Sequence, residues 1–171
     1  VFIEQMTDIA NSKLNKDRNL AFVTSVGDVW QHQTKKVDKK HLARGFPILD
    51  DPKYNDVIEV TDKTKTFEMP TAIKGYQLLS NANIPFGVAP GNHDYDAAWF
   101  ENTDRVHIGG LTNFLSAFSN NSSFYEDKPW YVDNYNGGTS SAQIFSAGGY
   151  SFLHFSLEMQ PSDDVLDWMQ T

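Results

Sequence analysis

Two short apolar segments, each preceded by a stretch with helical periodicity, set the fold class of this chain. Residues 20–26 (LAFVTSV) and 84–88 (IPFGV) are rich in Val, Ile and Phe and are too short for buried helices. In residues 1–14 and 66–81 the apolar side chains instead recur every three or four positions, as on one face of a helix. This alternation of helix and buried strand predicts an α/β protein.

The second half of the sequence predicts antiparallel strands as well. A hairpin is expected across Gly148-Gly149, and Ser162 is a suitable N-cap for a last helix. The 171 residues contain no internal repeat and no linker, so we expect one domain over residues 1–171. The remaining expected elements are a long connection over 31–65, helices over 95–102 and 107–119, a strand over 130–132, and hairpin strands over 142–146 and 150–157.

Composition excludes several classes of function. Without cysteine there is no disulfide framework, thiolate metal site or thiol nucleophile. The net charge is −8, and 12 of the 14 basic residues lie before residue 75, so the second half offers no basic face and nucleic acid is not the expected partner. The longest uncharged run, over 134–157, is too polar to span a membrane.

Two polar motifs follow the two apolar strands directly. Gly27-Asp28 ends the first strand, and Gly91-Asn92-His93-Asp94 follows the second, so both fall where open α/β sheets bind ligands. Carboxylate, amide and imidazole groups together suit Mn, Fe, Zn or Mg, and a histidine also transfers protons near neutral pH. Taken singly, each residue would be explained by ordinary turn chemistry.

The two motifs and their placement resemble the calcineurin-like metallophosphoesterase family. The stretch LLSNANIPFGVAPGNHDYD is similar to the family's helix–strand–loop approach to its third motif, and GGYSFLHFSLEMQPSDDVLDWMQ to a later hairpin and helix. The resemblance covers essentially the whole chain. Its texture is most similar to secreted or periplasmic bacterial members, with a cytoplasmic location as the alternative.

The resemblance implies a fold, a reaction and roles for four residues. The fold would be an α/β sandwich of two mixed β-sheets flanked by helices. The reaction would be hydrolysis of a phosphate mono- or diester at two divalent metal ions, with manganese favoured among Mn, Fe, Zn and Mg. Asp28 would bridge the metals and Asn92 would bind the second. His93 would protonate the leaving oxygen or stabilise phosphoryl charge, and Asp94 would support His93.

The sequence departs from the family pattern at both ends. The Asp-x-His motif expected before residue 1 and the two later histidine motifs expected after the last helix are absent. The other histidines do not replace them, and His154, in the middle of a strand, is expected to be a satisfied sheet histidine. We therefore expect an internal fragment of a longer phosphoesterase, incomplete in its sheets and inactive alone. The alternatives are a degenerate, non-catalytic phosphoesterase-like module, or metal ligands supplied by another chain.

Overall fold

The computed structural model describes residues 1–12, 19–30, 64–95, 111–159 and 161–171, and everything below concerns these residues. These residues form helices, a parallel pair of strands and an antiparallel sheet, so the protein is mixed α/β as expected. In chain order the elements are α1 (Phe2–Ser12), β1 (Val23–Ser25), a π-helical turn η2 (Thr64–Glu68), α3 (Met69–Asn81), β2 (Phe86–Val88), α4 (Thr112–Phe118), β3 (Tyr131–Tyr135), a 3-10 turn η3 (Asn136–Gly138), β4 (Ser140–Ala147), β5 (Tyr150–Ser156) and α5 (Asp163–Trp168).

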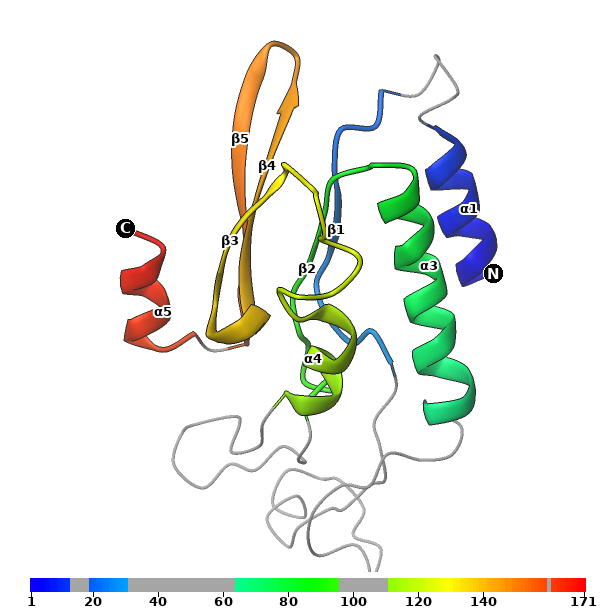
Figure 1. Cartoon of the computed structure of the whole chain (residues 1–171), viewed down its shortest axis with the longest axis horizontal. Helices are drawn as coiled ribbons and strands as arrows, with labels where there is room; N and C mark the ends of the chain where they lie inside the picture. Colours follow the sequence, from blue (N-terminus) through cyan, green and yellow to red (C-terminus); the bar gives the residue numbers. More distant parts are fainter. Residues whose placement is uncertain (13–18, 31–63, 96–110, 160) are drawn as a thin grey trace, which may run out of the picture.

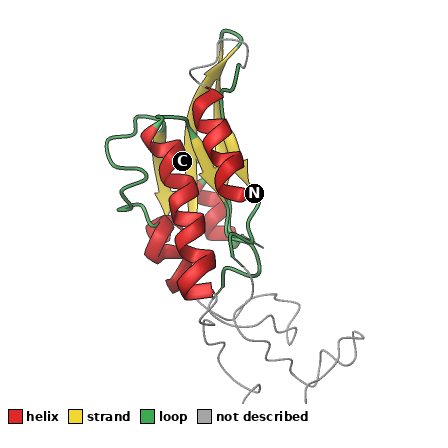
Figure 2. Ribbon diagram, turned by 90° about the vertical axis from the view of Figure 1, so that its right-hand side faces the viewer, coloured by secondary structure: helices red, strands yellow, loops and turns green. Residues whose placement is uncertain are grey.

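The elements are arranged in layers (Figure 1). Helices α1 and α3 lie side by side on one side of the β1–β2 pair, and Figure 2 shows both in front of the strands. Strands β3, β4 and β5 lie on the other side of β1–β2, with α5 beyond them. None of these helices is long and apolar enough to cross a membrane.

Strands β1 and β2 pair in parallel, with Val23 opposite Phe86 and Ser25 opposite Val88. Parallel neighbours need a long crossover, and α3 is the described helix of the connection between them. Both strands lie inside the segments predicted from the sequence, but only three residues of each pair. Because the strands are parallel, the loops that follow them emerge at the same edge.

Strands β3, β4 and β5 form a separate antiparallel sheet in sequence order. The predicted hairpin is confirmed, with Ala147 opposite Tyr150 across the two glycines. Within the described residues one sheet is wholly parallel and the other wholly antiparallel, so the expected sandwich of two mixed sheets stays a prediction. The antiparallel pairing follows from the connections: short turns join β3 to β4 and β4 to β5, and short turns impose antiparallel pairing.

An aromatic core lies between β2 and the helices α3 and α4. Phe86 is fully buried and contacts the rings of Tyr76 and Trp130, while Phe118 packs edge-on against Tyr76. The helix predicted over 107–119 is present as α4, whose residue Phe114 is fully buried. The long connection expected over 31–65, apart from its last two residues, and the helix expected over 95–102, apart from Tyr95, lie outside the described residues.

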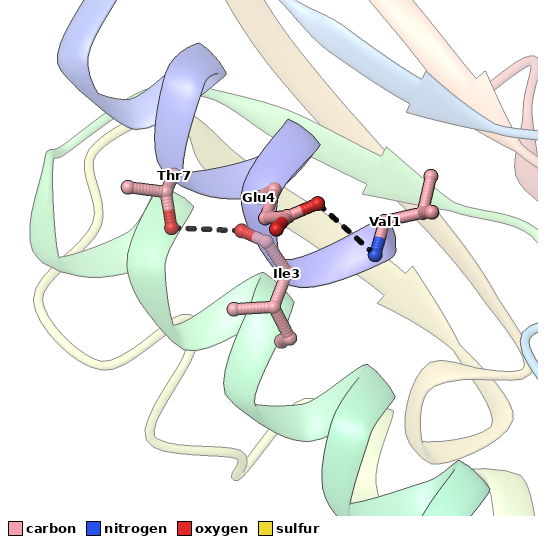
Figure 3. Close-up of polar contacts among 4 residues, drawn as sticks. All are labelled: Val1, Ile3, Glu4 and Thr7. Atoms are coloured by element: carbon pink, nitrogen blue, oxygen red, sulfur yellow. Dashed lines mark hydrogen bonds and ion pairs between the residues drawn. The ribbon is translucent and has the colours of Figure 1, made fainter.

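The helices near the two ends of the described chain, α1 and α5, correspond to the first and last helices predicted from the sequence. At the start of α1, the Thr7 hydroxyl donates to the Ile3 carbonyl at 2.7 Å, and the terminal ammonium of Val1 pairs with Glu4 at 3.2 Å (Figure 3). This ion pair is almost fully exposed and therefore contributes little to stability. In the predicted last helix, α5, Val165 is buried and Leu166 is 41% exposed.

The two sheets approach closely at Gly87. On β2, Phe86 and Val88 face the helices and Gly87 faces the opposite way, because side chains alternate along a strand. A Cβ on Gly87 would overlap the hydroxyl of Ser156 and lie 2.5 Å from Gln143 Oε1. A residue without a side chain is therefore required where β2 meets β4 and β5.

A buried polar network surrounds this contact. Gln143 is fully buried; its Nε2 donates to Ser141 at 2.7 Å, and its Oε1 accepts from Ser156 at 3.3 Å. His154 Nδ1 lies 3.2 Å from the same oxygen, which can only accept, so Nδ1 carries the proton. His154 Nε2 then accepts from the Thr24 hydroxyl at 3.3 Å, which links the antiparallel sheet to β1. His154 is thus the satisfied sheet histidine predicted from the sequence.

The close contact at Gly87 predicts that Gly87→Ala destabilises the protein by roughly 1–3 kcal/mol, the usual cost of overpacking. The added methyl would force β2 away from β4 and β5. The double variant Gly87→Ala/Ser156→Ala, which lacks the overlapping hydroxyl, should recover part of that loss. Urea unfolding measures both, and a Gly87→Ala protein as stable as the wild type would contradict the close approach.

The network also predicts a pH dependence of stability. Burial lowers the pKa of His154 below its ordinary value of 6.5, so the unfolded chain takes up the proton first as the pH falls. The contribution of His154 to stability is therefore present above pH 6.5 and is lost on acidification. Asp94 and Glu158, whose pKa values are raised, act in the opposite direction, so the informative quantity is the difference between wild type and variant.

The measurement is urea unfolding of the wild type and of His154→Gln at about pH 7.5 and about pH 5. The stability of the wild type relative to the variant should fall between the two pH values. A constant or rising difference would contradict the assigned environment of His154.

Candidate functional site

The two motifs predicted from the sequence lie together at one edge of the β1–β2 pair. We call residues 27–30 the β1 loop and residues 91–94 the β2 loop. Each begins two or three residues beyond its strand, and the last backbone hydrogen bond before them joins Ala89 N–H to the Ser25 carbonyl at 3.1 Å. The parallel pairing therefore brings Asp28 beside Asn92 and His93, although 64 or more residues separate them in sequence.

Two glycines let the loops touch through their backbones. A Cβ on Gly27 would overlap the backbone of Gly91, and a Cβ on Gly91 would overlap Asp28. Gly27 has φ +102° and Asp28 has φ 53°, so the β1 loop turns through left-handed conformations. Aspartate tolerates this region better than most residues, and the tight turn places Asp28 against the β2 loop.

Each loop accepts a hydrogen bond from the other through an aspartate. Asp28 Oδ1 accepts the backbone N–H of His93 at 3.1 Å. In the other direction, Asp94 Oδ1 accepts the backbone N–H of Val29 at 3.0 Å. Hydrogen bonds to charged acceptors are stronger than neutral ones, so this reciprocal pair fixes the loops against each other.

The two aspartates differ sharply in environment. Asp28 is exposed, whereas Asp94 has 0% exposure and also accepts from Gly91 N–H through Oδ2 at 2.8 Å. Burial raises the pKa of Asp94 to about 6, while the amides of Gly91, Val29 and Trp30 partly oppose that rise by stabilising the anion. Asp28 is therefore placed to meet a ligand, and Asp94 is not.

The donor groups suit a hard divalent cation only in part. Asp28 is exposed and Asn92 is half-buried, so a carboxylate and an amide oxygen are both accessible from the loops. His93 is also half-buried beside them. Within the described ranges there is no group of three or more His, Asp or Glu side chains arranged to hold a metal ion. Because two ligands do not retain a metal against water, this site would need more ligands than these.

Trp30, two residues after Asp28, ends the β1 loop. Its side chain is 3% exposed and contacts the rings of Phe114 and Phe118 on α4. Its indole N–H has no hydrogen-bond partner in the part of the chain that is described, so packing is the role that the structure shows. Trp30 therefore anchors the end of the β1 loop in the aromatic core. The signal that could have found this is a large aromatic residue two positions after the motif aspartate.

Comparison of the chain with models of known protein families, with curated proteins and with solved structures gives no match. What the structure does show is that the two motifs behind the metallophosphoesterase resemblance occupy one site.

The backbone contact between the loops predicts a large effect of Gly91→Ala. The methyl would displace Asp28 and break its hydrogen bond with the His93 amide, at a cost of roughly 1–3 kcal/mol in unfolding free energy. Urea unfolding and the amide chemical shift of His93 report the two effects. Unchanged stability together with an unchanged His93 shift would rule out the contact.

Proposed function

We propose that this chain carries part of the active site of a metal-dependent phosphoesterase, which hydrolyses a phosphate mono- or diester. The observation that supports this most strongly is the hydrogen bond from His93 N–H to Asp28 Oδ1, at 3.1 Å. It joins the Gly-Asp and Gly-Asn-His-Asp motifs across 65 residues at the carboxyl ends of adjacent parallel strands, where such sheets bind ligands.

Each exposed or half-buried residue of the loops has a role in this proposal. Asp28 and Asn92 would hold divalent cations, with manganese favoured, and the cations would supply Lewis-acid activation of the phosphoryl group and of water. Asp28 Oδ1 keeps a second lone pair after accepting from His93, and its carboxylate is exposed. His93 would donate a proton to the leaving oxygen or stabilise the charge on the phosphoryl oxygens.

The proposal predicts different losses for two variants of the intact protein. Asn92→Ala should lower manganese affinity, since it removes an oxygen ligand. His93→Ala should keep the metal but reduce turnover about 10²–10⁴-fold, the usual contribution of a positioned acid. Manganese content is measured by elemental mass spectrometry after loading and desalting, and turnover on p-nitrophenyl phosphate and bis(p-nitrophenyl) phosphate.

Asn120→Ala is the matched control, because Asn120 is exposed in the turn after α4, in a different part of the fold. It should change neither manganese content nor turnover. Absence of bound manganese in the intact protein, or a His93→Ala variant with wild-type turnover, would refute the proposal. Manganese binding without hydrolysis of either ester would favour a non-catalytic phosphoesterase-like binding module.

A further inference from the structure

We propose that Asp94 is a positioning residue of this site: its buried carboxylate clamps the β1 loop to the β2 loop and thereby sets where Asp28 lies relative to Asn92 and His93. The inference rests on the function proposed above, because only a metal-binding site requires Asp28, Asn92 and His93 to lie in a fixed arrangement. The clamp itself is a property of the folded chain, and its test does not require catalysis.

The hydrogen bonds of Asp94 divide between the two loops. Gly91 N–H, within its own loop, donates to Oδ2 at 2.8 Å. Val29 N–H, in the other loop, donates to Oδ1 at 3.0 Å and to Oδ2 at 3.3 Å. Turn chemistry alone would explain the bond to Gly91, three residues away. It does not explain the bonds to Val29, which is 65 residues away in sequence.

The clamped amides lie next to the residues that must be positioned. Val29 follows Asp28 directly, and Gly91 precedes Asn92 directly. If Asp94 shifted, the backbone that it holds would shift as well, and that backbone adjoins Asp28 in one loop and Asn92 in the other. The hydrogen bond between Asp28 and the His93 amide depends on the same alignment, although Asp94 is not part of it.

Burial separates this role from catalysis and from metal binding. Asp94 has 0% exposure, and both of its oxygens accept backbone hydrogen bonds. It therefore cannot contact a substrate in this arrangement. A buried carboxylate is costly unless it is fully hydrogen-bonded, so its presence here is explained by the amides that it joins. Asp28 supplies the exposed carboxylate, and the hydrogen bonds of Asp94 hold the two loops in a fixed position relative to each other.

The test is amide hydrogen exchange, followed by NMR, in the wild type, Asp94→Asn and Asp94→Ala. The amides of Val29 and Gly91 should lose protection by about 10-fold or more in Asp94→Ala, and less in the near-isosteric Asp94→Asn, which keeps one acceptor. The His93 amide should lose protection too, because the clamp aligns its bond to Asp28. Val23 and Ala89 amides, bonded between β1 and β2, should stay protected and so report that the variant is folded.

Two comparisons make the test specific. Asp28→Gly, which keeps the left-handed backbone at residue 28 accessible, should expose the His93 amide but leave Val29 and Gly91 protected. Asp133→Asn, which alters a carboxylate that accepts from the Trp168 indole at 3.0 Å, should leave every loop amide unchanged. Manganese affinity, measured by titration, should fall about 10–100-fold in Asp94→Ala, as expected for a residue that orients ligands without binding the metal.

The possible results separate the clamp from the proposed function. Protected Val29 and Gly91 amides in Asp94→Ala would overturn the clamp. Loss of their protection with a fully protected His93 amide would leave Asp94 a local structural residue and overturn the positioning role. If the wild type binds no manganese, the metal-dependent function fails, and the exchange of the His93 amide still decides whether Asp94 positions Asp28.

Discussion

The parallel pairing of β1 with β2 is the interaction on which the rest of this structure depends. It spans three residues of each strand, yet it fixes the end of the sheet at which the β1 loop and the β2 loop both leave their strands. An antiparallel arrangement would send the Gly-Asp and Gly-Asn-His-Asp motifs to opposite edges. The crossover through α3 makes the parallel arrangement possible, and the aromatic core around Phe86 holds β2 beneath that helix. The packing of α3 on β2 thus allows the parallel pairing, and the parallel pairing places the two loops at one site.

The sequence predicted the elements of the fold well where periodicity and turn chemistry agreed. The helical stripe around Tyr76 and the hairpin across Gly148-Gly149 are confirmed. Both predicted strands are present, but only β2 is buried, and β1 is half-buried or exposed along its length. Pairing partners were harder, because apolar segments do not encode whether their neighbours run parallel or antiparallel. The expectation of mixed sheets therefore stays a prediction, and the described strands form one parallel pair and one antiparallel sheet.

At the site, the sequence predicted which residues come together but not which of them are exposed and which are buried. Asp28 and Asp94 are chemically identical, and only the fold distinguishes an exposed carboxylate from one that accepts backbone amides on both oxygens. The sequence likewise could not show that Gly27 and Gly91 touch, since a contact between loops depends on strand register. Residue type thus indicated which groups are available, and burial distinguishes the carboxylate that solvent reaches from the one that it does not reach.

The contact at Gly87 has a consequence for how this protein tolerates change. Between β2 and the antiparallel sheet, the backbone of Gly87 packs directly against the side chains of Ser156, Gln143 and His154. Gly87 has no side chain to adjust, and the hydrogen bonds of Gln143 limit how far the opposite side chains can move. Larger side chains at Ser156 or Gln143, neither of which belongs to the loops, would therefore change the distance between β2 and the antiparallel sheet. Because the β2 loop follows β2 directly, such a change would also alter the position of Asn92 and His93.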